Sequence, residues 1–413
     1  MATSYSTGRF AEPIEVLVTD GHTRAGLAVV RSLARHGVSL LVLGAERFSP
    51  AFYSRKVKHA AQAPSPASAP QAFVEFALSA IREHKIQLAI PVTDHAVLLF
   101  DRHRQSFEHH ARLAMASSEA LRSVLDKRRS LELARQLGVP CPRQFELKAP
   151  EQVPQMVETM GFPIVLKQPG DPLDENVPRF DFRVLYAHNE AELHQYLQRY
   201  CRSGVYPLFQ ECALGEVHNL CCLAARGETI AVHEYQSIRR REGTGVLRKV
   251  VEPTPELVGY ARDLLRALLW DGVAHVAFFV DKPRGKTWFM EINGRFWASL
   301  EGSVHAGWDF PVWTYEYFLH GKRPQPGPLQ IGSMTCWHLG DLMALVSYWC
   351  GGEVPATGAN PGKLHSTLQF LGGFHPAIHS ETFHWSDPLP ALIEKCQWTG
   401  RAWKLVRRKV GGR

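Results

Sequence analysis

Apolar residues in the first part of the chain alternate between short continuous runs and stretches with helical spacing. Buried strands are predicted at 14–18 (IEVLV), 39–43 (SLLVL) and 86–92 (IQLAIPV), and helices are predicted between them in LAVVRSLARHG and PQAFVEFALSAIREHK. A helix that joins consecutive strands usually connects strands that run parallel. We therefore predict a Rossmann-like parallel-sheet domain over residues 1–116.

From residue 117 the pattern changes, and it predicts two helices followed by a mixture of strands and helices. The two helices cover SSEALRSVLDKRRSLELARQLG and end at a glycine before prolines. The expected later elements are a strand at 162–168 that carries Lys167 at its end, a helix at 189–200, a strand at 207–211, the paired strands HNLCCLAA and TIAVHEY, and a helix at 255–270. We assign these elements to one two-lobed α+β domain over 117–325, with a helical junction (117–150), a small lobe (151–215) and a large lobe (216–325).

A predicted hairpin carries the most informative polar residues of this domain. The apolar strand VAHVAFFV is followed by the turn DKPRGK and by WFMEINGRFW, residues 288–297. Because alternate side chains of a strand share a face, Glu291 and Asn293 are expected to point together. Their oxygens are ligands that suit Mg²⁺, and Arg295 offers a guanidinium for phosphate or carboxylate oxygens. A solvated edge strand is the plainer interpretation of these three residues when they are taken alone.

Composition and charge narrow the class of protein. The chain has 413 residues, 45% of them hydrophobic and 21% charged, which is ordinary for a globular protein of roughly two or three domains. The sequence shows neither a transmembrane run nor a signal-peptide core, so we expect a cytoplasmic protein. The eight cysteines are scattered without a C-x-x-C pair, which argues against zinc and disulfide frameworks. The net charge of +7 favours anionic ligands.

Two basic segments are candidates for contact with anions. Arg239, Arg240, Arg241 and Arg248 lie in SIRRREGTGVLRK, which we interpret as a glycine-containing loop beside a substrate pocket; a solvated loop is the alternative. The chain ends in RAWKLVRRKVGGR, where a frayed tail is favoured over a helix on a membrane surface.

Residues 326–413 form a C-terminal extension to which the sequence assigns no role. Trp337 and Trp349 are expected in the core rather than on a substrate platform. His375, His379 and His384 have spacings of four and five without a helical pattern, so we expect exposed histidines rather than a metal site.

The ordered set of these residues resembles the ATP-grasp superfamily, and more narrowly its carboxylate-amine ligases of the carbamoyl-phosphate-synthase type. The resemblance covers about residues 14–320. It rests on Lys127 in SSEAL…DK ahead of GVPCP, Lys167, Gln210-Glu211, Glu216, Glu291-x-Asn293-x-Arg295 and the following GRFWASLEGSVHAGWDFP.

The resemblance implies a role for each matching residue. Lys127 and Lys167 would contact the α and β phosphates of ATP, and Glu216 would hold the ribose. Mg²⁺, or Mn²⁺, would be bound by Glu291 and Asn293, while Arg295, Arg240 and Lys167 would act in catalysis. The adenine would lie at a hinge formed by Gln210, Glu211, Cys212, Ala213 and Leu214.

Two positions depart from the family pattern. The family usually places an acidic metal ligand where this chain has Ala277, so Asp281 or His275 would have to replace that ligand. The loop after Lys167 is usually rich in glycine, whereas GDPLDENVPRF supplies three acids and two prolines. Both departures predict weak or altered catalysis.

The favoured function is therefore an ATP- and magnesium-dependent ligase that activates a carboxylate as an acyl phosphate for attack by an amine. Its partners would be ATP and small, anionic carboxylate and amine substrates; nucleic acid is not expected, and a homodimer is left open. The alternatives are a nucleotide-binding protein with weak or lost catalysis, and a peripheral module that binds acidic lipid or polymer through residues 401–413.

Overall fold

The computed structural model describes residues 13–168, 180–182, 184–201, 205–241, 244–351 and 362–410, and of residues 400–410 only the backbone. The chain forms two compact units. The first combines the N-terminal residues up to Ala114 with Asp309–Pro324 and the residues from Thr382 onward; the second comprises Met115–Trp308 and Gln325–Glu381. The ranges expected from the sequence divide the chain differently, and their boundaries stay a prediction.

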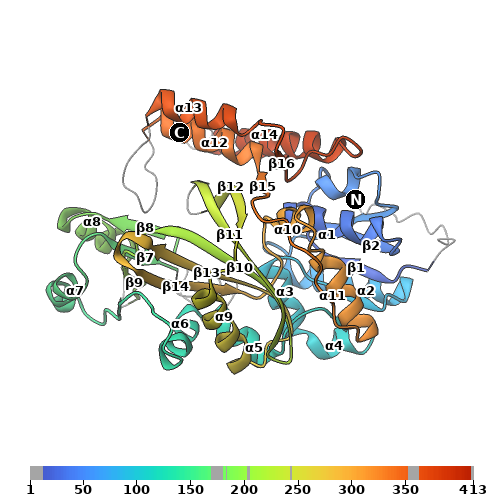
Figure 1. Cartoon of the computed structure of the whole chain (residues 1–413), viewed down its shortest axis with the longest axis horizontal. Helices are drawn as coiled ribbons and strands as arrows, with labels where there is room; N and C mark the ends of the chain where they lie inside the picture. The colour runs from blue at the N-terminus through green and yellow to red at the C-terminus, as the bar shows by residue number, and fades with distance from the viewer. Residues whose placement is uncertain are drawn as a thin grey trace. The chain divides into compact units, whose positions relative to one another are not determined.

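The first unit contains the predicted parallel sheet (Figure 1). Its strand order is β3-β2-β1-β4-β5, and each neighbouring pair is parallel. β1 is fully buried, as its apolar run requires. The strands are β1 (Val16–Val18), β2 (Leu40–Gly44), β3 (His59–Gln62), β4 (Leu88–Ile90) and β5 (Arg112–Leu113). The helices are α1 (Arg24–Arg35), α2 (Pro70–His84), α3 (Asp94–Arg102), α4 (Arg104–Glu108), α11 (Phe310–His320) and α14 (Leu389–Val410), with a 3₁₀ turn η1 (Pro50–Tyr53).

A buried ion pair ties the C-terminal segment to α1 in this unit. Arg31 donates to the Asp387 carboxylate at 2.9 Å and to the Thr382 carbonyl at 3.0 Å. The same carboxylate accepts from the Ser54 hydroxyl at 2.7 Å and from the Arg55 amide at 2.9 Å. The frayed tail that we expected is wrong for the backbone, because α14 continues to Val410.

The second unit begins with the two predicted helices and a small sheet. The sheet has the order β6-β9-β7-β8. It contributes to a hydrophobic core that includes the buried Met156, Leu193 and Phe209. The elements are α5 (Ser118–Leu125), α6 (Lys127–Gln136), β6 (Gln144–Phe145), η2 (Pro150–Gln152), α7 (Val153–Met160), β7 (Ile164–Lys167), β8 (Val184–Ala187), α8 (Glu190–Tyr200) and β9 (Leu208–Glu211).

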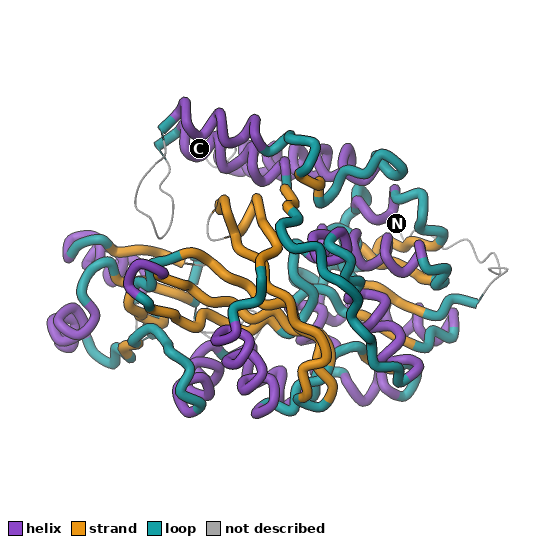
Figure 2. The backbone as a smooth tube through the Cα atoms, viewed as in Figure 1, coloured by secondary structure: helices purple, strands orange, loops and turns teal. Residues whose placement is uncertain are grey.

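A large sheet completes the second unit, with the order β14-β13-β10-β11-β12-β15-β16. Figure 2 draws the strands in orange. Its neighbouring strands are antiparallel except for β15 and β16. The strands are β10 (Glu216–Ala225), β11 (Glu228–Arg241), β12 (Thr244–Val251), β13 (Gly272–Asp281), β14 (Lys286–Asn293), β15 (Met334–Cys336) and β16 (Ile378–Ser380). The other elements are α9 (Pro255–Ala267), η3 (Lys282–Arg284), α10 (Leu300–His305), α12 (His338–Trp349) and α13 (Lys363–Gly372). Among the described helices, none is long and apolar enough to cross a bilayer.

Capping fixes the two helices that pack on β14. The Ser117 hydroxyl accepts from the Ala120 amide at 3.2 Å and starts α5. The Asp126 carboxylate accepts from the Arg128 amide at 2.8 Å and starts α6. Both helices contact β14, and the Phe289 amide of β14 donates to the Pro140 carbonyl at 2.7 Å. Because Lys127 is the first residue of α6, these contacts hold it beside the hairpin.

Candidate functional site

The hairpin of β13 and β14 places Glu291, Asn293 and Arg295 together, as strand alternation predicted. The Asn293 amide Nδ2 donates to Glu291 Oε1 at 3.1 Å, and Arg295 donates to Asn293 Oδ1 at 3.4 Å. Ile292 points to the opposite face and is buried, whereas the three polar residues are half-buried. Two oxygen donors and one guanidinium therefore share a partly open site.

Further polar residues orient Asn293, and no spacing in the sequence connects them with it. His275 lies opposite Asn293 in the β13–β14 register, and its Nδ1 accepts from Asn293 Nδ2 at 3.3 Å. Its Nε2 then carries the proton and donates to the Tyr235 hydroxyl oxygen at 2.9 Å. Burial, assisted by the charge of Arg295, lowers the pKa of His275 to about 3, so the ring is neutral. Since Nδ2 is occupied, Oδ1 is the Asn293 atom presented to a ligand.

The register also shows what stands opposite Glu291. That position is Ala277, whose side chain is buried and offers only a methyl group. Asp281, which we expected as a replacement metal ligand, lies opposite Lys286, four residues and about 13 Å further along the strand. Its carboxylate accepts from the Arg284 amide and pairs with the Arg284 guanidinium at 2.9 Å. The structure thus does not bring Asp281 to Glu291, and both ring nitrogens of His275 are already bonded.

Lys167 ends β7 in the small sheet, where the sequence placed it. Burial, assisted by the charge of Lys127, lowers its pKa to about 8, and the charge of Glu291 opposes this shift. Lys127 and Glu291 therefore lie close enough to Lys167 to influence its charge. Two cations opposite one anion leave a surplus of positive charge that suits phosphate oxygens.

The expected hinge connects β9 to β10. Gln210 is buried between β6 and β7. The Glu211 side chain pairs with Arg143 at 2.5 Å, and the Glu211 amide donates to the Arg143 carbonyl at 2.9 Å. Glu216 pairs with Lys282 at 2.9 Å; burial raises its pKa, but hydrogen bonds from Lys282 and His218 outweigh burial and lower it.

Gly215, just before Glu216, has φ +142, and a Cβ there would lie 2.6 Å from the carbonyl group of Val280. The hinge therefore needs a glycine at this position. Cys212, Ala213 and Leu214 make the connection, with Ala213 buried and Leu214 exposed.

The arginine cluster lies on strands β11 and β12, which corrects the loop that we expected from its glycines. Arg240 lies with its guanidinium 5.9 Å from the ring centre of Phe279. Burial lowers the pKa of Arg240, and the nearby Tyr186 opposes that effect. Arg239 instead bonds Asp341, and Arg248 bonds the buried Glu381. Arg239 and Arg248 are thus bonded to carboxylates, and the catalytic role expected for Arg240 stays a prediction.

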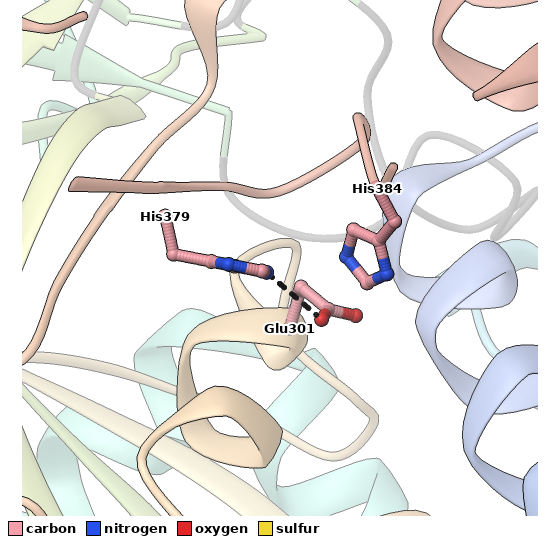
Figure 3. Close-up of side chains that lie close together, drawn as sticks. All are labelled: Glu301, His379 and His384. Carbon is pink, nitrogen blue, oxygen red and sulfur yellow. Dashed lines mark hydrogen bonds and ion pairs between the residues drawn. The ribbon is translucent and has the colours of Figure 1, made fainter. Parts of the chain in front are cut away.

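His379 is not the exposed histidine that its spacing suggested. Its Nε2 lies 3.3 Å from Glu301 Oε1, as Figure 3 shows, and its ring stacks on His305 with the ring centres 3.9 Å apart. His375 is exposed, as expected. Of the two tryptophans that we expected in the core, Trp337 is buried, whereas Trp349 is 48% exposed and does not belong to the core.

Most of the loop after Lys167 (171–182) and the positively charged end (401–413) lie outside the residues whose side chains are described. The expectations about the acids of that loop and about the cations of that end therefore stay predictions.

Comparison with known proteins identifies relatives of this fold. The chain matches no family model. It is 30% identical over 194 residues to an N5-carboxyaminoimidazole ribonucleotide synthase of Synechococcus elongatus, and this alignment covers 45% of the chain and 46% of the relative. The aligned part is thus less than half the length of that curated relative.

Solved structures extend the likeness over most of the chain. The ADP complex of an N5-carboxyaminoimidazole ribonucleotide synthetase has a TM-score of 0.61 at 15% identity and covers 88% of this chain and 98% of its own. The biotin carboxylase domain of Hydrogenobacter thermophilus 2-oxoglutarate carboxylase, in complex with MgADP, ADP and bicarbonate, has a TM-score of 0.60 at 15% identity and covers 78% and 74%.

These likenesses confirm the resemblance drawn from Lys127, Lys167 and the Glu291-x-Asn293-x-Arg295 set. The chain has the ATP-grasp fold.

Proposed function

We propose that the protein is an ATP-dependent ligase that activates a carboxylate as an acyl phosphate and passes the acyl group to an amine. The observation that carries the proposal is the group of Glu291, Asn293 and Arg295 at the end of β14, within electrostatic reach of Lys167. Relatives with the same fold have been solved with ADP and with MgADP, which supports a nucleotide at this place.

The oxygens of Glu291 and Asn293 fit a hard divalent cation such as Mg²⁺, or Mn²⁺. When bound, this ion would neutralise phosphate charge during phosphoryl transfer. Only these two protein ligands are proposed, because Ala277 supplies none and Asp281 is held by Arg284. We therefore expect a metal affinity that is weaker than a third carboxylate would give.

The cationic side chains would then each bind a different part of the negatively charged substrates. Lys127 and Lys167 would hold the α and β phosphates, and the guanidiniums of Arg295 and Arg240 would hold the transferred phosphoryl group and the acyl phosphate. The backbone of 211–214 would read the adenine edge, and Glu216 would hold the ribose after exchanging its bond to Lys282. Their common task is orientation and charge stabilisation, since the phosphoryl transition state needs little covalent assistance.

The experiment that tests the proposal is turnover with panels of carboxylates and amines. Bicarbonate belongs in the panel because a related structure binds it, and an aminoimidazole ribonucleotide belongs there because of the name of the curated relative. Release of ADP and phosphate that requires both substrates is expected, together with its loss in Glu291→Ala. Unchanged turnover in that variant would show that the metal site is wrongly assigned.

A second candidate function follows from Ala277. A nucleotide-binding protein with little or no catalysis would tolerate a methyl group opposite Glu291. In that case ATP would raise the melting temperature, Mg²⁺ would add nothing further, and none of the substrate pairs would produce ADP.

A further inference from the structure

A row of side chains that includes Glu291 crosses three neighbouring strands of the large sheet, β14, β13 and β10 (Figure 1). Ala277 lies opposite Glu291 in the β13–β14 register, and Asn219 lies opposite Ala277 in the β10–β13 register. Side chains that are paired in this way project from the same face of a sheet. Asn219 therefore lies on the face that carries Glu291 and Asn293.

Ala277 is the residue that separates the two polar ends of this row. Two strand spacings place the backbones of Glu291 and Asn219 about 10 Å apart. The side chain of Ala277 ends at its Cβ, so it adds only a methyl group to the space between them. A longer side chain at this position would stand between the carboxylate and the amide.

Asn219 is a buried amide with one of its two ends in use. The residue is 5% exposed, and its Nδ2 donates to Ser237 Oγ at 3.4 Å. The described part of the chain provides no donor to its Oδ1. Polar groups that are buried to this degree usually have hydrogen-bond partners. The free oxygen, beside a proposed cation site, therefore indicates a ligand that the protein itself does not supply.

The neighbouring positions on this face cannot take the same role. Val217 and Cys221 share the face with Asn219 by strand alternation, and neither has a side-chain oxygen. His275, on the adjacent strand, uses both of its ring nitrogens in hydrogen bonds. Of these four residues, Asn219 alone offers an oxygen to a cation or to its water.

We propose that Asn219 helps to hold the divalent ion of the nucleotide site, with its Oδ1 accepting a hydrogen bond from a water molecule bound to that ion. This inference rests on the proposed function. Mg²⁺ usually keeps several of its waters in proteins, so an amide two strands from Glu291 can act on the ion through one of them. The contact adds a ligand on the side where Ala277 provides none, and it adds no charge.

Asn219→Asp tests the proposal, because a negative charge at this position should act in opposite directions on free and on metal-bound nucleotide. Calorimetric titration of the full-length protein with ADP measures both. With Mg²⁺ present, ADP should bind about threefold to tenfold more tightly than to the wild type, because the carboxylate attracts the hydrated ion. Without Mg²⁺, ADP should bind at least about threefold more weakly, because the carboxylate repels the phosphates. Asn219→Ala should lose about threefold to tenfold of the affinity that Mg²⁺ adds and keep the rest.

The matched control is Asn189→Asp, which adds the same charge at the N-cap of α8, where Asn189 Oδ1 accepts from the Glu192 amide at 2.9 Å. Aspartate and asparagine cap helices about equally well, so this variant should bind ADP like the wild type in both conditions.

Ala277→Glu supplies a second and independent test. A carboxylate between Asn219 and Glu291 should increase the effect of Mg²⁺ on ADP binding, and it should take over the contact of the amide. Asn219→Ala should then have no further effect in the double variant, so the two substitutions should not be additive. Melting curves of all variants show whether they are folded.

Weaker binding of ADP to Asn219→Asp both with and without Mg²⁺ would overturn the proposal, and so would an unchanged effect of Mg²⁺ in Asn219→Ala. If Glu291→Ala removed the effect of Mg²⁺ while both Asn219 variants kept it, the proposed metal site would stand and the role of Asn219 would be refuted. Absence of any Mg²⁺ effect in the wild type would contradict the proposed function, and this inference with it.

Discussion

Asn293 is held in one orientation by neighbours on both sides. His275 and Glu291 accept from its Nδ2, so its Oδ1 is directed towards the guanidinium of Arg295. An asparagine without this support could present either end of its amide, because the two ends are nearly equal in shape. The neutral ring of His275 and the hydroxyl of Tyr235 therefore act as positioning groups for the proposed metal ligand.

Tyr235→Phe tests this positioning role. The variant removes the acceptor of the His275 proton and leaves a buried N–H unpaired, so His275 should reorient and release Asn293. We expect the Mg²⁺-dependent part of ADP affinity to fall roughly threefold to tenfold, while affinity without Mg²⁺ stays unchanged. The control is Tyr260→Phe, which removes a hydroxyl bonded to Glu256 on the exposed side of α9. A parallel loss with and without Mg²⁺ would indicate general destabilisation instead.

The lowered pKa of Lys167 gives a prediction about pH. Free Lys167 loses its proton near pH 8, and nearby phosphates would raise its pKa again. Nucleotide binding should therefore take up a proton above about pH 8, and the affinity should fall as the pH rises through this value. Calorimetry in buffers of different ionisation enthalpy measures this uptake, which Lys167→Met should remove. Proton release on binding, or uptake that persists in the variant, would contradict the assignment.

At this scale the sequence predicted the polar face of β14 but not its support. The alternation of side chains along a strand is a local property. The eight residues of β14 were therefore enough to predict that Glu291 and Asn293 share one face. The pairing of Asn293 with His275 depends on the hairpin register, which shifts between Ala277 and Phe278. Arg239 and Asp341 are 102 residues apart, and Arg248 and Glu381 are 133 apart. Pairs at such distances depend on the tertiary fold and leave no trace in spacing.

The connection between β9 and β10 shows how one element sets the geometry of the site. The chain enters β10 at Gly215 so close to β13 that a methyl group would meet the Val280 carbonyl. Glycine is needed there for both conformation and space. Other turns of the chain could be predicted from residue types that usually form turns. The need for glycine at position 215 comes instead from the neighbouring strand β13.

Gly215→Ala should destabilise the second unit by about 1 to 3 kcal/mol and weaken ADP binding, because either the strained backbone or β13 must shift. Gly259→Ala is the matched control: it lies inside α9 with open space around its Cβ, and it should stabilise by about 0.4 to 1 kcal/mol. Urea unfolding and calorimetry measure both effects. An unchanged melting curve for Gly215→Ala would show that the close approach is not required.

On the scale of the whole chain, residues far apart in the sequence build the same unit. The segment from Thr382 joins the N-terminal sheet through Arg31 and Asp387, a connection that neither charge nor hydrophobic pattern predicted. The parallel sheet itself was predictable from alternating strands and helices. The role of the last residues was not, since Asp387 pairs with a residue 356 positions earlier.

Asp387→Asn should lower the stability of the first unit by about 3 to 5 kcal/mol, because it leaves the buried Arg31 without its counter-charge. Burial raises the pKa of Asp387, but its bonds to Ser54, Arg55 and Arg31 outweigh burial and lower it. Its stabilisation is therefore present above the pKa of an unfolded aspartate and is lost as the pH falls through the lowered value. Thermal melting across pH measures this, with the exposed Asp263→Asn as a control that should change little.

The proposed function requires a divalent ion held by Glu291 and Asn293 at the nucleotide phosphates. Calorimetric titration of ADP, with and without Mg²⁺, into wild type, Glu291→Ala and the exposed control Glu228→Ala tests it most directly. We predict that Mg²⁺ tightens ADP binding about tenfold in the wild type and in Glu228→Ala, and has no effect in Glu291→Ala. An equal effect of Mg²⁺ in all three proteins, or no effect in the wild type, would contradict the assignment.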